Sequence, residues 1–294
     1  MKKDFFNQWI VDNFGGNTAK EGIERKVNEL LTETKQTQLP VRLSEISKII
    51  GINHQPIYQN QNSWGQLITR DNEFRISLKM KTGKPPSINW SGYPALRFGY
   101  AHELIHCLFY DFTYQPPKRK APVDKKSEEI LCNYGASLLL LPSQQLNDFM
   151  KENCNRNIIK VAKDLSDKSY VSFYACIIRL INEDFFQEKK NKLYILSSIS
   201  EGLHNTNIKK PRCLISVIYN GNEKRKTFIP TYKGLDIISD SWSLQNYHKN
   251  GYLPTKVFIQ NEIIEFQNNK YVINGTHELI NNAYVWSDLK IQEL

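Results

Sequence analysis

The segment RFGYAHELIHCLFYDF, residues 97 to 112, carries two histidines and a glutamate inside an otherwise apolar run. A helix this apolar is usually buried, and burying ionisable groups without partners is strongly unfavourable. His102, Glu103 and His106 therefore need a binding partner inside the fold. A metal ion would be such a partner.

The three residues form the pattern His-Glu-x-x-His. On a helix, His102 and His106 lie four positions apart and share one face, so both imidazoles can reach one ion. Glu103 lies about 100° further round the helix, where it meets water on the metal rather than the metal itself. A catalytic zinc site needs one more protein ligand and keeps one position open for water.

The next predicted helix, SEEILCNYGASLLLL, offers that ligand. Glu129 and Asn133 lie four positions apart on one face, so both can point towards the first helix. We expect Glu129 to complete the zinc shell and Asn133 to accept a hydrogen bond from the far ring nitrogen of a ligating histidine. Glu128 points about 100° away and is the competing candidate for the ligand.

Each helix alone also has an ordinary explanation. Two histidines can be satisfied surface or core residues, and a glutamate pair near a helix start often compensates the helix dipole. The two patterns on successive apolar helices together favour the metal site. We expect Cys107 and Cys132 to be small buried hydrophobes, and we assign no role to the isolated histidines His54, His204, His248 and His277.

Periodicity predicts an α+β fold. Helices are expected over 18–34, with Thr18 as the N-cap, and over 43–50, with Ser44 as the cap and Gly51 as the stop. Two or three antiparallel strands are expected between residues 57 and 80, and Pro94 suits the first turn of the His-Glu-x-x-His helix. Ser127 is the expected cap of the following helix, and further helices are expected over 143–151, 158–164 and 171–186.

The composition shifts towards strands after about residue 192. We therefore divide the chain into a domain that carries the His-Glu-x-x-His motif, 1–192, and a β-rich C-terminal domain, 193–294, with a hairpin expected to turn at Asn268 and Asn269. Nothing in the second domain identifies a ligand. A sensory or substrate-selecting role is our hypothesis for it.

Charge and cysteine content limit the partners and the compartment. The net charge is +9, but its clusters, such as KRK at 118–120, lie in loops without interleaved aromatics. We interpret them as solvated loops and disfavour nucleic acid as a partner. The five scattered cysteines form no paired motif, no run is apolar enough to span a membrane, and the N-terminus is too polar for a signal peptide. We expect a cytoplasmic protein that does not contact membranes.

The two helices together resemble the ImmA/IrrE-type metallopeptidases, whose pattern is Arg-Phe-x-x-Ala-His-Glu-x-x-His followed by Glu-x-x-Ala-Asn-x-Phe-Ala-Ala-x-Leu-Leu-x-Pro. The resemblance extends over roughly residues 41–182 and leaves the C-terminal part uncovered. Cys132 and Ser137 replace alanines, Gly135 replaces a phenylalanine, and Ile105 replaces a frequent glycine. Matching residues are Arg97, Phe98, Ala101, His102, Glu103 and His106 in the first part, and Glu129, Asn133, Ala136, Leu139, Leu140 and Pro142 in the second.

The resemblance implies a zincin-like peptidase domain with a small antiparallel sheet. It also implies an intracellular zinc or manganese protease that cuts a helix-turn-helix repressor in response to stress or phage induction. Glu103 would be the general base, and Zn²⁺ would activate water and polarise the scissile carbonyl. The alternative is a non-catalytic regulator, in which the metal only staples the fold while the protein binds a repressor or nucleic acid.

Two further parts of this mechanism stay open at the level of sequence. An extended substrate could add to an edge strand within 65–70 or 74–80. The residue that stabilises the oxyanion could be any of four tyrosines: Tyr100, Tyr134, Tyr170 or Tyr174.

Overall fold

The structure is a computed structural model of the 294-residue chain. It describes residues 5–80, 85–153, 156 and 158–183, and the backbone of strand segments 192–199, 211–219, 226–228, 256–266, 269–280 and 284–293. The internal contacts divide the chain into two compact units, Met1–Phe185 and Phe186–Leu294, which we describe separately. The boundary predicted after residue 192 lies near this division, at the first residue of a strand.

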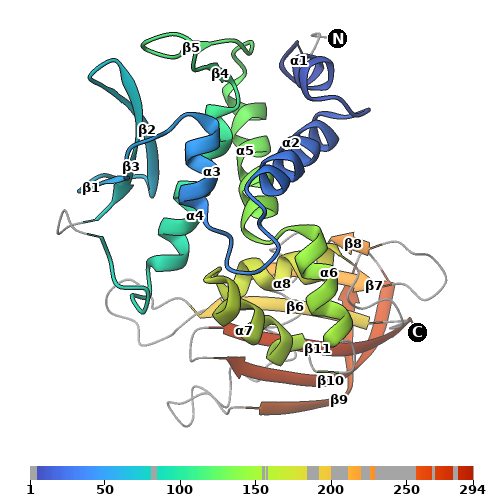
Figure 1. The fold of residues 1–294 in the computed structure, drawn as a ribbon. Helices are drawn as coiled ribbons and strands as arrows, with labels where there is room; N and C mark the ends of the chain where they lie inside the picture. The colour runs from blue at the N-terminus through green and yellow to red at the C-terminus, as the bar shows by residue number, and fades with distance from the viewer. Residues whose placement is uncertain are drawn as a thin grey trace. The chain divides into compact units, whose positions relative to one another are not determined.

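The described residues place the chain in the α+β class (Figure 1). The first unit contains helices and two small sheets. Its helices are α1 Phe5–Phe14, α2 Ala19–Glu33, α3 Leu43–Ile50, α4 Tyr93–Cys107, α5 Lys125–Leu140, α6 Ser143–Glu152, α7 Ile158–Ser169 and α8 Phe173–Asn182. The first of them, α1, was not among the predicted elements; it buries Phe6 and Ile10, and Phe6 meets the ring of Phe109 edge-on.

The larger sheet of the first unit has three strands in the order β1 (Ile57–Gln59), β3 (Glu73–Lys79), β2 (Gly65–Arg70). β2 and β3 form the expected antiparallel hairpin, and its turn places Asp71 and Asn72 in the left-handed region. β1 instead runs parallel to β3, which corrects the all-antiparallel prediction. β3 is the central strand and the most buried of the three, and the chain passes from β1 to β2 on the far side of it.

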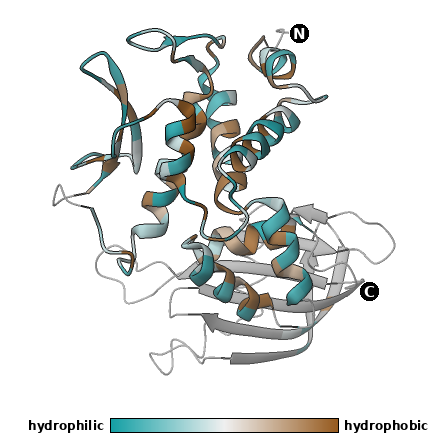
Figure 2. Ribbon diagram, viewed as in Figure 1, coloured by the Kyte–Doolittle hydropathy of each residue, from teal (hydrophilic) through white to brown (hydrophobic). Residues whose placement is uncertain are grey.

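Helix α4 is buried on most of its circumference, as expected for a helix that is apolar nearly all round. Pro94 lies in its first turn, as the sequence predicted. α4 packs against α5, against α3, and against strands β2 and β3. Brown, hydrophobic stretches mark α4 and α5 in Figure 2, whereas much of α2 is teal. The core of this unit therefore surrounds the helix that carries the His-Glu-x-x-His motif.

The predicted helix starts are confirmed at one position and wrong at two. Thr18 caps α2, accepting a hydrogen bond from the backbone of Glu21. Asp124, rather than Ser127, caps α5, and its carboxylate accepts from both the backbone and the hydroxyl of Ser127. Helix α3 starts after Arg42 without a side-chain cap, so Ser44 lies inside it; Gly51 ends α3 in the left-handed conformation, as predicted.

Three helices, α6, α7 and α8, follow α5 in the first unit. Pro142 follows the end of α5 and precedes α6, and Ser172 caps α8. Arg179 of α8 is buried and donates to the carbonyl of Leu141, so it ties α8 to the end of α5. The predicted end of the last helix, residues 184–186, lies outside the described residues.

The second unit contains a six-stranded sheet in the order β8-β7-β6-β11-β10-β9. All its neighbouring strands pair antiparallel. Asn269 pairs with Phe266, so the β9–β10 connection is residues 267–268, one residue earlier than predicted; these two lie outside the described residues. Its strands are β6 Lys192–Ile199, β7 Pro211–Tyr219, β8 Lys226–Phe228, β9 Lys256–Phe266, β10 Asn269–Ile280 and β11 Tyr284–Glu293.

Within the part of the chain that the structure describes, every helix is too short or too polar to cross a lipid bilayer.

Candidate metal centre

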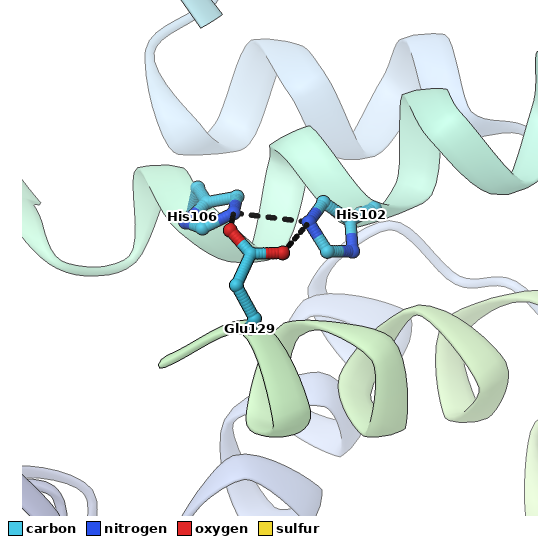
Figure 3. Close-up of side chains that lie close together, drawn as sticks. All are labelled: His102, His106 and Glu129. Carbon is cyan, nitrogen blue, oxygen red and sulfur yellow. Dashed lines mark hydrogen bonds and ion pairs between the residues drawn. The ribbon is translucent and has the colours of Figure 1, made fainter. Parts of the chain in front are cut away.

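Helices α4 and α5 bring three predicted ligands together. His102 and His106 project from one face of α4, and Glu129 projects from the first half of α5 towards both rings (Figure 3). One ligand atom from each of the three residues lies within 4.8 Å of the others. The side chains that the sequence placed on two successive helices therefore meet in space.

The distances in this cluster are short. The Nε2 atoms of His102 and His106 lie 3.0 Å apart. Oε2 of Glu129 lies 3.3 Å from Nε2 of His102, and Oε1 lies 3.4 Å from Nε2 of His106. Ligand atoms about 2.0 to 2.1 Å from a tetrahedral zinc ion lie about 3.3 Å from one another. The three side chains thus have the spacing that a zinc shell requires.

The outer nitrogens of the two rings are already occupied. Nδ1 of His102 lies 3.0 Å from Oδ1 of Asn133, and Nδ1 of His106 lies 2.8 Å from Oε1 of Glu128. A carboxylate only accepts hydrogen bonds, and so does an amide oxygen. Both rings therefore donate from Nδ1, which leaves both Nε2 atoms as bare acceptors facing each other and the Glu129 carboxylate.

Such a group of acceptors needs a positive charge between them. Two imidazole lone pairs and a carboxylate repel one another unless a proton or a cation lies among them. Two nitrogens and one oxygen are also the donor set of many catalytic zinc sites. On spacing, tautomer and donor chemistry, His102, His106 and Glu129 fit a zinc ion.

The protonation of the two imidazoles differs because their surroundings differ. Burial lowers the pKa of His102, and the neighbouring His106 lowers it further. Burial also opposes the charged form of His106, but its hydrogen bond to Glu128 and the nearby carboxylates outweigh burial and raise its pKa. His102 is therefore the imidazole that is more readily neutral, the form in which imidazole binds metals.

Glu103 lies beside the cluster on α4 and is only 7% exposed. Burial raises the pKa of its carboxyl group above the ordinary value of 4.5, although a hydrogen bond from the backbone of Leu67 and the nearby His106 oppose the rise. A buried carboxylate with a raised pKa, next to a ligand cluster, has the character of a general base. This is the position that the sequence predicted for it.

A cavity of about 950 Å³ opens over the cluster. One wall is β2 with the residues before it, and the opposite wall is α5. Gly65 and Gly99 let β2 approach α4, because a Cβ on Gly99 would lie 2.8 Å from the carbonyl carbon of Trp64 and 2.9 Å from the nitrogen of Gly65. The lining includes Trp64, Gly65, Leu67, Phe98, His102, Glu103, His106, Tyr110, Arg119, Val123, Glu128 and Glu129.

Glu128 occupies a different position from Glu129. Its side chain is 8% exposed, against 58% for Glu129, and it pairs with Arg119 as well as with His106. Burial would raise the pKa of Glu128, but hydrogen bonds from His106 and Arg119 outweigh burial and lower it to about 2. Glu128 was predicted only as a rival ligand; it instead contacts the outer side of His106.

Arg119 is the residue that sequence reasoning missed. It lies in the KRK cluster interpreted as a solvated loop, yet it ends β5 (Lys118–Arg119), which pairs with β4 (Tyr110–Asp111). Its guanidinium reaches Glu128 at 2.6 Å. The charge cluster alone gives no sign of this contact, because the hairpin that places Arg119 has only two-residue strands.

The other candidates lie away from the cluster. Cys107 and Cys132 are buried free thiols whose pKa values burial raises, which agrees with the predicted packing role. The described tyrosine that lines the cavity is Tyr110, which was not among the four proposed. His54 pairs with Glu73, and His204 and His248 lie outside the described residues.

The four proposed tyrosines have other surroundings. Tyr100 bonds to Ser47, Tyr134 interacts with Lys20 and Glu24, and Tyr170 lies against the ring of Tyr93. Tyr174 does not line the cavity either.

No protein-family model matches the chain, and no curated protein matches it. Among solved structures, the chain is similar to a Mycobacterium tuberculosis transcriptional regulator, with 12% sequence identity and a TM-score of 0.44. The match covers 99% of this chain and 92% of that chain.

Proposed function

We propose that this protein is a zinc-dependent endopeptidase of the ImmA/IrrE type, with a zincin-like catalytic domain. The observation that carries the proposal is the orientation of the two imidazoles. Their outer nitrogens donate to Asn133 and Glu128, and their inner nitrogens converge as acceptors on Glu129 beside a buried Glu103. The resemblance of the motifs to that family supports the same assignment, with Mn²⁺ as the alternative metal.

The residues divide the chemistry among themselves. His102, His106 and Glu129 would hold the ion, which when bound supplies Lewis acidity that polarises a carbonyl and acidifies water. Glu103 takes the proton from the attacking water and delivers it to the leaving amine. Its raised pKa suits both steps, because a carboxyl group with a pKa nearer neutrality both accepts and returns a proton efficiently.

Strand β2 is the proposed docking edge for an extended peptide. The sheet order places β3 in the centre, so of the two segments predicted as docking edges only 65–70 lies at the edge. Gly65 and Leu67 line the cavity, and the backbone of Leu67 donates to Glu103. A peptide added along β2 would pass over the ligand cluster, with its backbone aligned by strand pairing.

The proposed substrate is a regulatory protein, such as a helix-turn-helix repressor, in stress or phage-related regulation. The proposed role of the second unit is to sense a signal or to select the substrate. Both assignments derive from the family resemblance and from the division of the chain. Deleting residues 193–294 tests the second: cleavage that becomes constitutive or is lost supports it, and unchanged cleavage contradicts it.

The decisive test compares wild type with Glu103→Gln, both loaded with zinc, on a repressor encoded beside this protein. We expect wild type to cleave it and the variant to be slower by about 10²- to 10⁴-fold, because the variant lacks the general base. Zinc content should be equal in both, since Glu103 is not a ligand. Equal cleavage rates, or no cleavage by zinc-loaded wild type, would contradict the protease and favour the non-catalytic regulator.

A further inference from the structure

The outer side of His106 differs from the outer side of His102. His106 donates to a buried carboxylate, Glu128, whereas His102 donates to Asn133, an exposed amide. Glu128 is held in turn by two nitrogens of Arg119, at 3.3 Å to Oε1 and 2.6 Å to Oε2. This two-point contact fixes the plane of the carboxylate and therefore the direction of its bond to His106.

Most N–H groups of Arg119 donate to oxygen atoms of the protein itself. Its Nε donates to the carbonyl of Ala121 at 2.9 Å, and Nη2 donates to the carbonyl of Pro122 at 2.9 Å. Its remaining contacts are the two bonds to Glu128 and the ring of Tyr110, whose centroid lies 5.6 Å from the guanidinium carbon. A guanidinium carries five N–H donors, and these bonds use four of them. Arg119 is therefore engaged mainly in contacts within the protein.

Arg119 connects three parts of the first unit. Arg119 ends the β4–β5 hairpin, the carbonyls of Ala121 and Pro122 belong to the loop that leads into α5, and Glu128 lies in the first turn of α5. His106 lies in the last turn of α4. One guanidinium thus sets the position of the hairpin, the start of α5 and, through Glu128, one imidazole of α4.

We propose that Glu128 is a positioning residue that holds the ring of His106 from its outer side, and that Arg119 locks Glu128 in that position. The inference rests on the proposed metal site. The carboxylate orients the ring so that Nε2 faces Glu129, and its charge strengthens the ring as a ligand. On the His102 side Asn133 orients the ring without a charge, so the two ligands are supported unequally.

The test measures zinc affinity, by competition with a chromogenic chelator, in wild type, Glu128→Gln, Glu128→Met and Arg119→Lys. In Glu128→Gln the side chain keeps one acceptor oxygen but loses the negative charge, and in Glu128→Met it keeps a similar volume but loses both. In Arg119→Lys the side chain keeps the positive charge but loses the two-point hydrogen bonding of the guanidinium. We expect the affinity for zinc to fall about 10-fold in Glu128→Gln and in Arg119→Lys, and about 100-fold in Glu128→Met. The visible spectrum of the cobalt-loaded variants should change in the same order, because the ring is no longer held.

Lys118→Ala is the matched control. Lys118 is the basic neighbour of Arg119 on the same strand, and it contacts the ring of Tyr114 rather than the metal site. Its removal should leave zinc affinity unchanged. The double variant Arg119→Lys/Glu128→Met should lose no more affinity than Glu128→Met alone, because Arg119 acts through Glu128.

Zinc affinity and a cobalt spectrum equal to wild type in Glu128→Met would overturn the inference. So would additive losses in the double variant. Should Glu128→Met not fold without metal, Arg119→Lys decides by the same criteria. Because affinity is measured without a substrate, these outcomes are independent of whether the zinc-loaded protein cleaves a repressor.

Discussion

The two sides of the histidine pair are built by different means. On the inner side, the Nε2 atoms face Glu129, which is 58% exposed and borders an open cavity. On the outer side, the Nδ1 atoms meet Asn133 and the nearly buried Glu128. Under the proposed function, the inner side exchanges the metal and admits the substrate, and the outer side holds the rings in position.

Adjacent glutamates show the difference most directly. Glu128 and Glu129 are neighbours in sequence, yet the 100° step between helix positions turns one towards Arg119 and the other towards the cavity. From the sequence, both residues were candidates for the third metal ligand. The structure shows that each contacts a different side of the same imidazole.

The largest difference that we expect between the outer and inner sides of the histidine pair is in how the free energy of unfolding depends on pH. The pKa of Glu128 is lowered to about 2 from the ordinary 4.5, so its stabilising contribution is present above pH 4.5 and is lost as the pH falls through 2. Metal-free wild type should exceed Glu128→Gln in unfolding free energy by up to about 3 kcal/mol near neutral pH. Urea unfolding at several pH values measures the difference, which should shrink steadily in acid.

Asn133→Ala is the control for this pH dependence, because it removes the uncharged outer partner. Its difference from wild type should change with pH much less than that of Glu128→Gln, because Asn133 carries no charge and acts on pH only through the small rise that its hydrogen bond gives the pKa of His102. A pH-independent difference for Glu128→Gln would show that the carboxylate is not held ionised by His106 and Arg119.

A smaller effect should come from the wall of the inner side. In Gly99→Ala the added methyl would meet the backbone of Trp64 and Gly65, which are fixed in place by the strand. Such overpacking costs about 1 to 3 kcal/mol, and alanine recovers about 1 kcal/mol through its helix propensity. We expect a net loss of about 1 kcal/mol, slower cleavage and unchanged zinc affinity.

Thermal unfolding and a cleavage assay measure the effect of Gly99→Ala. An unchanged melting temperature together with unchanged cleavage would mean that β2 does not depend on its close approach to α4. Weaker zinc binding would mean that the position of this wall also affects the ligands His102, His106 and Glu129.

The sequence predicted what lies within a helix better than what joins separate segments. The four-residue spacing of His102 and His106, and of Glu129 and Asn133, fixes which side chains share a face, and these side chains do meet. The apolar character of α4 likewise predicted its burial. Helical geometry is local, so a sequence contains enough information to predict it.

The sequence did not predict contacts between segments that lie far apart in the chain. Arg119 reaches Glu128 because a hairpin of two-residue strands folds back onto α5, and such short strands have no recognisable periodicity. The parallel pairing of β1 with β3 was missed for a similar reason, since β1 has only three residues and its direction depends on contacts with a strand further along the chain. Tyr110 was overlooked because it follows the end of α4, where the helical spacing no longer applies.

The most direct test of the central claim is the zinc content of the purified protein after dialysis, measured by elemental analysis. We predict about one zinc per chain in wild type and in Glu103→Gln, and almost none in His106→Ala and Glu129→Ala. Wild type that takes up no zinc, or a Glu129→Ala variant that keeps its full content, would contradict a metal site formed by the inner side of the histidine pair.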